Sequence, residues 1–319
     1  MLTYILLIVG FVFLIKGADL LVDGSAALAK KYNISNIAIG LTIVAFGTST
    51  PELIVNLFAS INGNTDIAIG NVVGSNIVNI LFILGVSASI FPLVTKSNTI
   101  WKEIPMSLLA ALMLFVMAND QLIDGGTNSM LTRIDGIVLL AFFVIFLYYT
   151  VGISKAETDD SPEIDIPVLS SGKSVLYIIL GLTGLVLGGK WIVDGAVHMA
   201  KSLGLSESLI GLTVVAVGTS LPEMAASAVA AYKKQTDIAI GNVVGSNIFN
   251  IFFILGISSL IKPLPFNAGT AIDVMVACFA SVLLFILLFV GKKHTIEKWQ
   301  GIFMILIYVG YIVFLINTK

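Results

Sequence analysis

Two six-residue segments place oxygen-bearing groups inside apolar sequence: residues 47–52 read G-T-S-T-P-E, and residues 218–223 read G-T-S-L-P-E. Proline lacks a backbone N–H and clashes with the carbonyl four residues earlier, so we expect each helix to break here and to free carbonyl oxygens. Carbonyls, hydroxyls and carboxylates are the ligands that calcium and sodium prefer. The sequence contains no Cys or His cluster that would indicate zinc or copper.

The carboxylates Glu52 and Glu223 are the strongest functional candidates in these segments. An unpaired carboxylate near the middle of a bilayer costs at least ~2.5 kcal/mol, and neither glutamate has a Lys or Arg close by in sequence. Proline kinks are also common in membrane helices for packing alone, so the kinks by themselves leave a structural explanation open. We therefore assign ion binding to the two glutamates.

The segment that follows each motif carries a stripe of polar residues. Asn71, Ser75 and Asn79 are spaced four residues apart and share one helical face. The second stripe consists of Asn242, Ser246 and Asn250. Glycines at positions 70, 74, 241 and 245 have the spacing that lets another backbone approach closely. For Asn71, Asn76, Asn242 and Asn247 we favour hydrogen bonding between helices over ligand roles.

Composition shows that membrane-spanning helices must hold these groups. The 319 residues are 57% hydrophobic and 11% charged, with a mean hydropathy of +1.03, which excludes a water-soluble fold. The net charge of -2 gives no basic excess for nucleic acid, so we expect none as a partner. The single cysteine, Cys278, cannot form an intramolecular disulfide.

An internal repeat organises the chain. Residues 39–93 align without a gap on residues 210–264 at a constant offset of 171, and 35 of the 55 positions are identical. A period this long is half of the protein rather than one turn of a solenoid. Apolar runs of spanning length predict five helices in each half. The predicted spans are 2–28, 37–60, 66–92, 102–118 and 134–152, then 174–200, 208–232, 237–261, 270–290 and 297–317.

Because five is odd, the second half must enter the membrane from the opposite side. The predicted fold class is therefore an all-α polytopic membrane protein whose ten transmembrane helices form two inverted five-helix repeats, with broken helices at the midplane. The first half comprises residues 1–153 and the second half residues 174–319. Residues 154–173 are polar, acidic and proline-containing, and form the predicted connector.

Positively charged loop residues predict the orientation of the chain. With both termini outside and the 154–173 connector in the cytoplasm, the inner loops hold eleven lysines and the outer segments only four basic residues. The remaining two lysines lie within the first helix of each half, and we expect Lys16 to pair with Asp19 and Lys190 with Asp194, or to extend to the interface.

At these motifs the chain resembles the cation/calcium exchanger superfamily, specifically the sodium/calcium exchanger branch with two alpha-repeats. The resemblance rests on G-T-S-x-P-E and G-N-V-V-G-S-N-I-x-N-I, each present twice. Proton/calcium exchangers typically carry Gly-Asn-x-x-Glu instead. The resemblance implies a set of metal-binding residues shared between the halves. It consists of Glu52, Glu223, Thr48, Thr219, Ser49, Ser220, Ser75, Ser246, Asn79, Asn250, Ala45 and Ala216.

Within this set the resemblance implies distinct roles. Glu52 and Glu223 would be the central calcium ligands, assisted by the carbonyls of Thr48 and Thr219. The sodium sites flanking the centre would use Ala45, Thr48, Ser49 and Ser75 with their equivalents. Asn79 and Asn250 would line the middle site. Several relatives, including the potassium-dependent exchangers, have Asp at the position of Asn250. With Asn there, the centre carries two formal charges, which predicts transport independent of potassium.

The function implied is secondary active exchange of sodium for calcium by alternating access, with three sodium ions per calcium and net charge movement. Calcium and sodium are transported ions, the lipid bilayer is the other partner, and we expect no cofactor, no enzymatic activity and a functional monomer. A proton/calcium or other divalent-cation exchanger stays open as the alternative. A cation channel and an intramembrane protease rank lower, since an inverted repeat favours alternating access and paired catalytic residues are not evident in the sequence.

Overall fold

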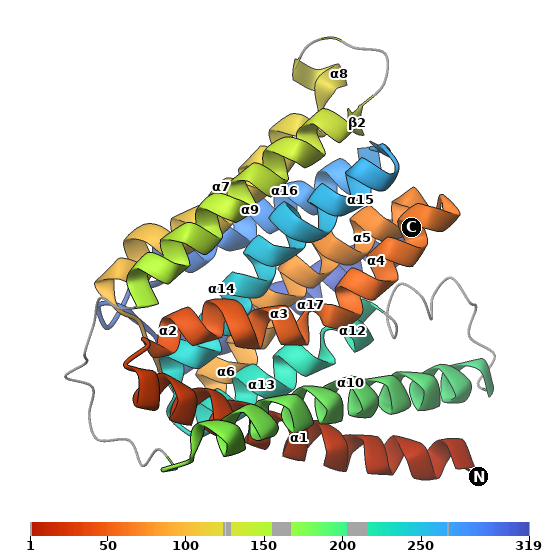
Figure 1. The fold of residues 1–319 in the computed structure, drawn as a ribbon. Coiled ribbons are helices and arrows are strands. Elements are labelled where there is room, and N and C mark those ends of the chain that lie inside the picture. Colours follow the sequence, from red (N-terminus) through yellow and green to blue (C-terminus); the bar gives the residue numbers. More distant parts are fainter. Residues whose placement is uncertain are drawn as a thin grey trace.

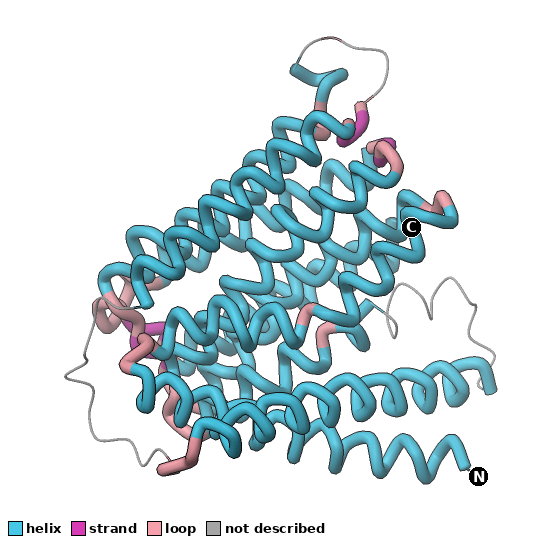
Figure 2. Tube along the Cα trace, viewed as in Figure 1, coloured by secondary structure: helices cyan, strands magenta, loops and turns pink. Residues whose placement is uncertain are grey.

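A computed structural model describes residues 2–123, 125, 129–154, 167–202, 216–266 and 268–318. The chain is built almost entirely of helices (Figures 1 and 2). In the first half these are α1 (Leu2–Tyr32), α2 (Asn36–Ile39), α3 (Ala45–Thr48), α4 (Thr50–Asn62), α5 (Thr65–Ile77), α6 (Gly85–Ile90), α7 (Ile104–Met117), α8 (Asp120–Ile123) and α9 (Arg133–Ser154). In the second half they are α10 (Ser171–Ser202), α12 (Ala216–Thr219), α13 (Leu221–Tyr232), α14 (Thr236–Ile248), α15 (Gly256–Ile261), α16 (Ala268–Leu287) and α17 (Lys298–Thr318).

Eight helices in the described residues are long and apolar enough to cross a membrane, or nine when the bent pair Asn36–Thr48 and Thr50–Asn62 counts as one span. The protein is therefore a multi-pass membrane protein. The predicted span 208–232 lies partly outside the described residues, which begin again at residue 216.

Two helix ends differ from the prediction for identifiable reasons. The first helix continues to Tyr32 because the residue that ends it, Asn33, adopts a left-handed conformation with φ of 51°. Helix α10 begins at Ser171, inside the predicted connector, because the Ser170 hydroxyl accepts the Lys173 N–H (3.3 Å) as an N-cap.

The two halves repeat the same backbone geometry. Single residues, Ser49 and Ser220, interrupt the second helix of each half, with φ/ψ of -82°/7° and -86°/7°. The third helix of each half widens into a π-helical segment, Val78–Leu84 in one and Phe249–Leu255 in the other. Such segments occur frequently at functional sites, since the extra residue per turn redirects side chains.

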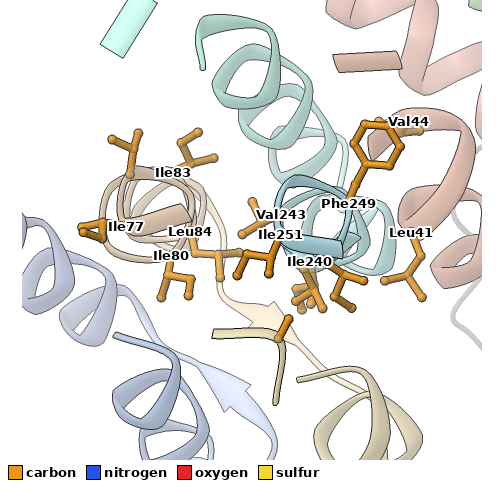
Figure 3. Close-up of a cluster of buried hydrophobic side chains, with 14 of the residues drawn as sticks. Leu41, Val44, Ile77, Ile80, Ile83, Leu84, Ile240, Val243, Phe249 and Ile251 are labelled. Carbon is orange, nitrogen blue, oxygen red and sulfur yellow. The ribbon is translucent and has the colours of Figure 1, made fainter. Parts of the chain in front are cut away.

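The third helices of the two halves form the centre of the molecule. Of the most apolar part of Thr236–Ile261, 94% of residues are buried, and for Thr65–Ile90 the share is 72%, against 22–39% for the other spanning helices. Their apolar side chains pack with those of the π-helical segment Gly40–Val44, and Figure 3 shows this cluster around Leu84, Ile240 and Ile251. The remaining spans are positioned to face lipid.

Helices α1 and α10 lie side by side and antiparallel along one face of the molecule (Figure 1). Glycines bring their backbones together: a Cβ added to Gly17 would lie 2.8 Å from the Gly181 carbonyl oxygen, and one added to Gly10 would lie 2.9 Å from that of Gly188. The glycines recur every seven residues, so the contact extends along both helices. Substitution by any larger residue would force these helices apart.

Short strands join loops at the two ends of the bundle. Strand β1 (Leu93–Val94) pairs with β4 (Thr295–Ile296), and β2 (Met130–Leu131) pairs with β3 (Leu264–Pro265), both antiparallel. Each pair connects one half to the other. Loops that are far apart in sequence are thereby held at a common end of the molecule.

Candidate functional site

The two helix breaks set the position of the site. Between α3 and α4 the axis bends by 48° at Ser49, so the break expected at Pro51 is present. Pro51 and Pro222 occupy the first turns of α4 and α13, where a missing N–H costs nothing. The glutamate after each proline also lies in this first turn, where the positive end of the helix dipole favours a negative charge.

The carboxylates are buried and held by serines of the opposite half. Glu52 and Glu223 are each 1% exposed. Ser49 Oγ donates to Glu223 Oε1 (2.8 Å), and Ser220 Oγ donates to Glu52 Oε1 (3.3 Å). Within the described ranges no Lys or Arg forms an ion pair with either glutamate. Two acidic groups are thus buried together without a protein cation, an arrangement that a bound cation would stabilise.

The serines of the polar stripes also contact this group of serines and carboxylates. Ser246 Oγ lies 2.9 Å from Ser49 Oγ, and Ser75 Oγ lies 3.2 Å from Ser220 Oγ. The hydroxyl of Ser75 also donates to Glu52 Oε1 at 3.5 Å. Four serines predicted from the two motifs therefore surround the carboxylates, two from each half.

Asn79 and Asn250 are the second residues of the two π-helical segments, one turn beyond these serines. Their side chains are each 1% exposed, and their Nδ2 groups donate to other asparagines. Their Oδ1 atoms are buried and accept no hydrogen bond, as is also true of the Oε2 atoms of Glu52 and Glu223. Two carboxylate and two amide oxygens are therefore available for a cation, and they come equally from the two halves.

The hydroxyls of Thr48 and Thr219 and the carbonyl of Ala45 already take part in hydrogen bonds within the protein. Thr48 Oγ1 donates to Asn242 Oδ1 (3.0 Å), so its hydroxyl is turned toward a neighbouring helix. The Ala45 carbonyl accepts the Ser49 N–H (3.0 Å), and the Thr48 hydroxyl oxygen lies 3.3 Å from it as a longer alternative partner. Thr219 donates to Asn71 Oδ1 (3.4 Å), whereas for Ala216 only the backbone is described.

The sequence patterns did not predict a role for Asn56 and Ser227, which hydrogen-bond to asparagines of the polar stripes. Asn71 donates to Asn56 Oδ1 (2.7 Å), and Asn242 donates to Ser227 Oγ (2.9 Å) and to the Glu223 carbonyl (3.2 Å). Asn56 and Ser227 are equivalent in the repeat and follow the glutamates by one helical turn. That spacing was the available signal. Asn71 and Asn242 do bond between helices, and their partners include the candidate ligands Thr219 and Thr48.

Comparison with known proteins identifies the family of this chain. The family described as sodium/calcium exchanger protein matches residues 2–152 and 173–317. The chain belongs to this family. The exchanger is 38% identical over 302 residues to the uncharacterized membrane protein MJ0091 of Methanocaldococcus jannaschii, covering 95% of this chain and 94% of the other. It is 32% identical over 343 residues to the sodium/calcium exchanger MaX1 of Methanosarcina acetivorans, covering 98% of each.

A solved structure resembles the exchanger over nearly its whole length. The structure of the sodium-calcium exchanger NCX_Mj, soaked with 100 mM Na+ and 10 mM Sr2+, matches with a TM-score of 0.85 at 36% identity and covers 98% of both chains. The superfamily assignment made from the motifs is thereby confirmed. The exchanger has no group of three His, Cys, Asp or Glu residues in its described part that could hold a metal ion, so its candidate site depends on neutral oxygens as well as carboxylates.

Proposed function

We propose that the exchanger moves calcium across the membrane in exchange for sodium, using one site that the two ions occupy in turn. The observation that carries this proposal is the set of four buried oxygens without partners, contributed by Glu52, Glu223, Asn79 and Asn250. Calcium needs 6–8 oxygen ligands, and serine hydroxyls and nearby carbonyls can supply the rest. One calcium ion neutralises both carboxylates, whereas sodium must bind more than once to do so.

Competition for the same charges leads to exchange rather than joint transport. With three sodium ions per calcium, as the family resemblance implies, one net charge crosses in each cycle. With two carboxylates and neutral asparagines the centre offers no third charge for potassium. The proposed exchange is therefore electrogenic and independent of potassium.

Alternating access follows from an inverted arrangement of the two halves, with ten spans in all. Support comes from the loops: β1 follows the third predicted span and pairs with β4 after the ninth, while β2 follows the fourth and pairs with β3 after the eighth. Two loops that follow odd-numbered spans thus meet at one end, and two loops that follow even-numbered spans meet at the other. The moving part would be α1 with α10, which are joined through glycines, and the remaining helices would form the fixed part. The lysine distribution places both termini outside and residues 154–173 in the cytoplasm.

Purified exchanger in proteoliposomes tests the function directly. Liposomes loaded with sodium should accumulate radioactive calcium when diluted into sodium-free choline medium, and should not when sodium is equal on both sides. Calcium uptake without a sodium gradient would indicate a channel, and uptake driven by a pH gradient alone would indicate a proton/calcium exchanger. Thiocyanate loaded inside makes the interior positive as it leaves, and should accelerate uptake because net positive charge exits with sodium.

A further inference from the structure

Four asparagines cross-link the two central helices beside the carboxylates. Asn76 and Asn79 lie on the third helix of the first half, and Asn247 and Asn250 occupy the equivalent places in the second. All four side chains are at most 3% exposed. Asn79 Nδ2 donates to Asn247 Oδ1 (2.9 Å), and Asn250 Nδ2 donates to Asn76 Oδ1 (3.0 Å). Each candidate ligand is thus held by an asparagine of the opposite half.

Backbone carbonyls determine which way these amides face. The Asn247 amide donates to the Asn76 carbonyl (3.4 Å), and the Asn76 amide donates to the Asn247 carbonyl (3.3 Å). A carbonyl can only accept, so in both residues the NH2 group must face the backbone and Oδ1 must face the candidate ligand. That ligand must then offer its own NH2, which leaves its Oδ1 directed elsewhere. The orientation of Asn79 and Asn250 therefore follows from two backbone atoms.

We propose that Asn76 and Asn247 are positioning residues that make Asn250 and Asn79 present oxygens, rather than N–H groups, to the transported cation. An asparagine turned the other way would direct a donor at a cation and repel it. Hydrogen bonding between helices alone would need only the bonds to the carbonyls. In each residue the second bond, to a candidate ligand, goes beyond that need. The proposal rests on the function proposed above.

A double-mutant cycle between Asn247 and Asn79 tests the proposal. Asn79→Ala should raise the calcium concentration for half-maximal uptake by about 10-fold, and Asn247→Ala by a similar factor. Because Asn247 acts through Asn79, the double variant should be no more than about 2-fold worse than Asn79→Ala. Calcium protection of the purified protein against thermal unfolding provides the same comparison without transport. Ser281→Ala removes a buried hydroxyl that bonds to the Ala277 carbonyl within α16 (3.0 Å) and serves as the matched control.

Two isosteric substitutions separate positioning from stability. Asn247→Asp keeps an oxygen acceptor for Asn79 Nδ2, while Asn247→Leu keeps the shape and loses it. We expect Asp to retain the calcium dependence within about 3-fold and Leu to shift it by about 10-fold, even though Leu lowers thermal stability less than Asp. In the double variant of Asn247→Asp and Asn79→Ala, residue 247 no longer has a ligand to position. The change in calcium dependence relative to Asn79→Ala then measures the effect of the added charge alone.

Several results would overturn the proposal. Additive effects in the cycle, unchanged calcium dependence in Asn247→Ala, or a Leu variant that outperforms Asp would each do so. If the Asn247 variants do not fold, the same cycle with Asn76→Ala and Asn250→Ala decides, since the second pair is equivalent. A wild-type protein that does not exchange sodium for calcium would overturn the proposed function and this inference with it. Additivity in a working exchanger would overturn the positioning role alone.

Discussion

The two halves of the exchanger agree at the site and differ in the charged residues of their first helices. The glutamates, serines and asparagines proposed as ligands are of the same type at an offset of 171, and the serine contacts cross between the halves in both directions. Within the first helices, Asp19 of α1 corresponds to Lys190 of α10, and Lys233, which follows α13, corresponds to Asn62 at the end of α4. The proposed alternating access would open the same site to both sides of the membrane, which favours equivalent ligands, whereas it does not require equal charges on the first helices.

The ion pairs of the first helices show the difference. Lys233, at the end of α13, lies 2.7 Å from Asp19 and 2.7 Å from Asp23, and so connects α1 to the central bundle. In the second half Lys190 pairs with Asp194 of its own helix at 2.7 Å, as the sequence spacing predicted. The predicted pair of Lys16 and Asp19 is present but longer, at 3.9 Å. Helix α1 is thus attached to the bundle by charge, while the ion pair on α10 remains within its own helix.

The largest expected effect tests whether the halves are equivalent at the carboxylates. Glu52→Gln and Glu223→Gln each remove one of two charges from a buried site, and each should reduce sodium-driven calcium uptake by about 100-fold or more. Glutamine can still accept the serine hydroxyl, so the fold should survive. Thermal unfolding of the purified variants checks that point. Near-normal uptake in one variant would remove that glutamate from the site and make the halves unequal.

Acidification should reduce uptake by several-fold, because protons compete with calcium for the same carboxylate oxygens. The sign follows from charge: a protonated carboxyl is neutral and a poor ligand, so uptake falls as pH falls. Initial rates between pH 8 and pH 5, with the sodium gradient held constant, provide the measurement. Raising calcium should partly restore the rate at low pH. A rate that is flat down to pH 5 would contradict a site built on two carboxylates.

Sequence identified the ligand candidates but not the contacts that orient them. Glu52 and Ser49 could be found because the cost of burying polar groups in a membrane is a local property and the repeat shows it twice. The roles of Asn76 and Asn247 depend on contacts between halves that lie far apart in sequence. The partner of Asp23 was missed for the same reason, since Lys233 lies 210 positions away.

A third carboxylate would change the charge of the site, because Asn79 and Asn250 are both neutral. Asn250→Asp places a carboxylate beside Glu52 and Glu223, and like charges in a buried site raise one another's affinity for protons or monovalent cations. Wild-type uptake should be the same with and without potassium. The variant should lose more activity on acidification or become sensitive to potassium. Asn79→Asp is the matched variant in the other half and should behave alike. Strict dependence on potassium in the wild type would refute the assignment to the potassium-independent branch.

The smallest expected effect concerns the unequal ion pairs of α1 and α10. Burial alone would lower the pKa of Lys233, but hydrogen bonds and charge from Asp19 and Asp23 outweigh it and raise the pKa above its ordinary value. Lysine is therefore charged at every pH used for transport, and its stabilising contribution would be lost only in strong alkali. Lys233→Gln should weaken the attachment of α1 to α13. At about 1 kcal/mol for a partly exposed pair, the population in which α1 has separated from the bundle should rise by about 5-fold.

Cysteine labelling measures that shift. Ala29 is 1% exposed and follows Asp23 on α1, so Ala29→Cys, with Cys278→Ala to remove the native thiol, should react slowly with a maleimide while α1 is packed on the bundle. Lys233→Gln should accelerate the reaction by about 5-fold, because the buried cysteine is reached only when α1 separates from the bundle. Lys190→Gln, which breaks a pair confined to α10, should leave the rate unchanged. Equal acceleration by both substitutions would mean that loss of charge, and not the attachment of α1 to α13, controls the opening, and the ion pairs of the two first helices would then be alike in effect.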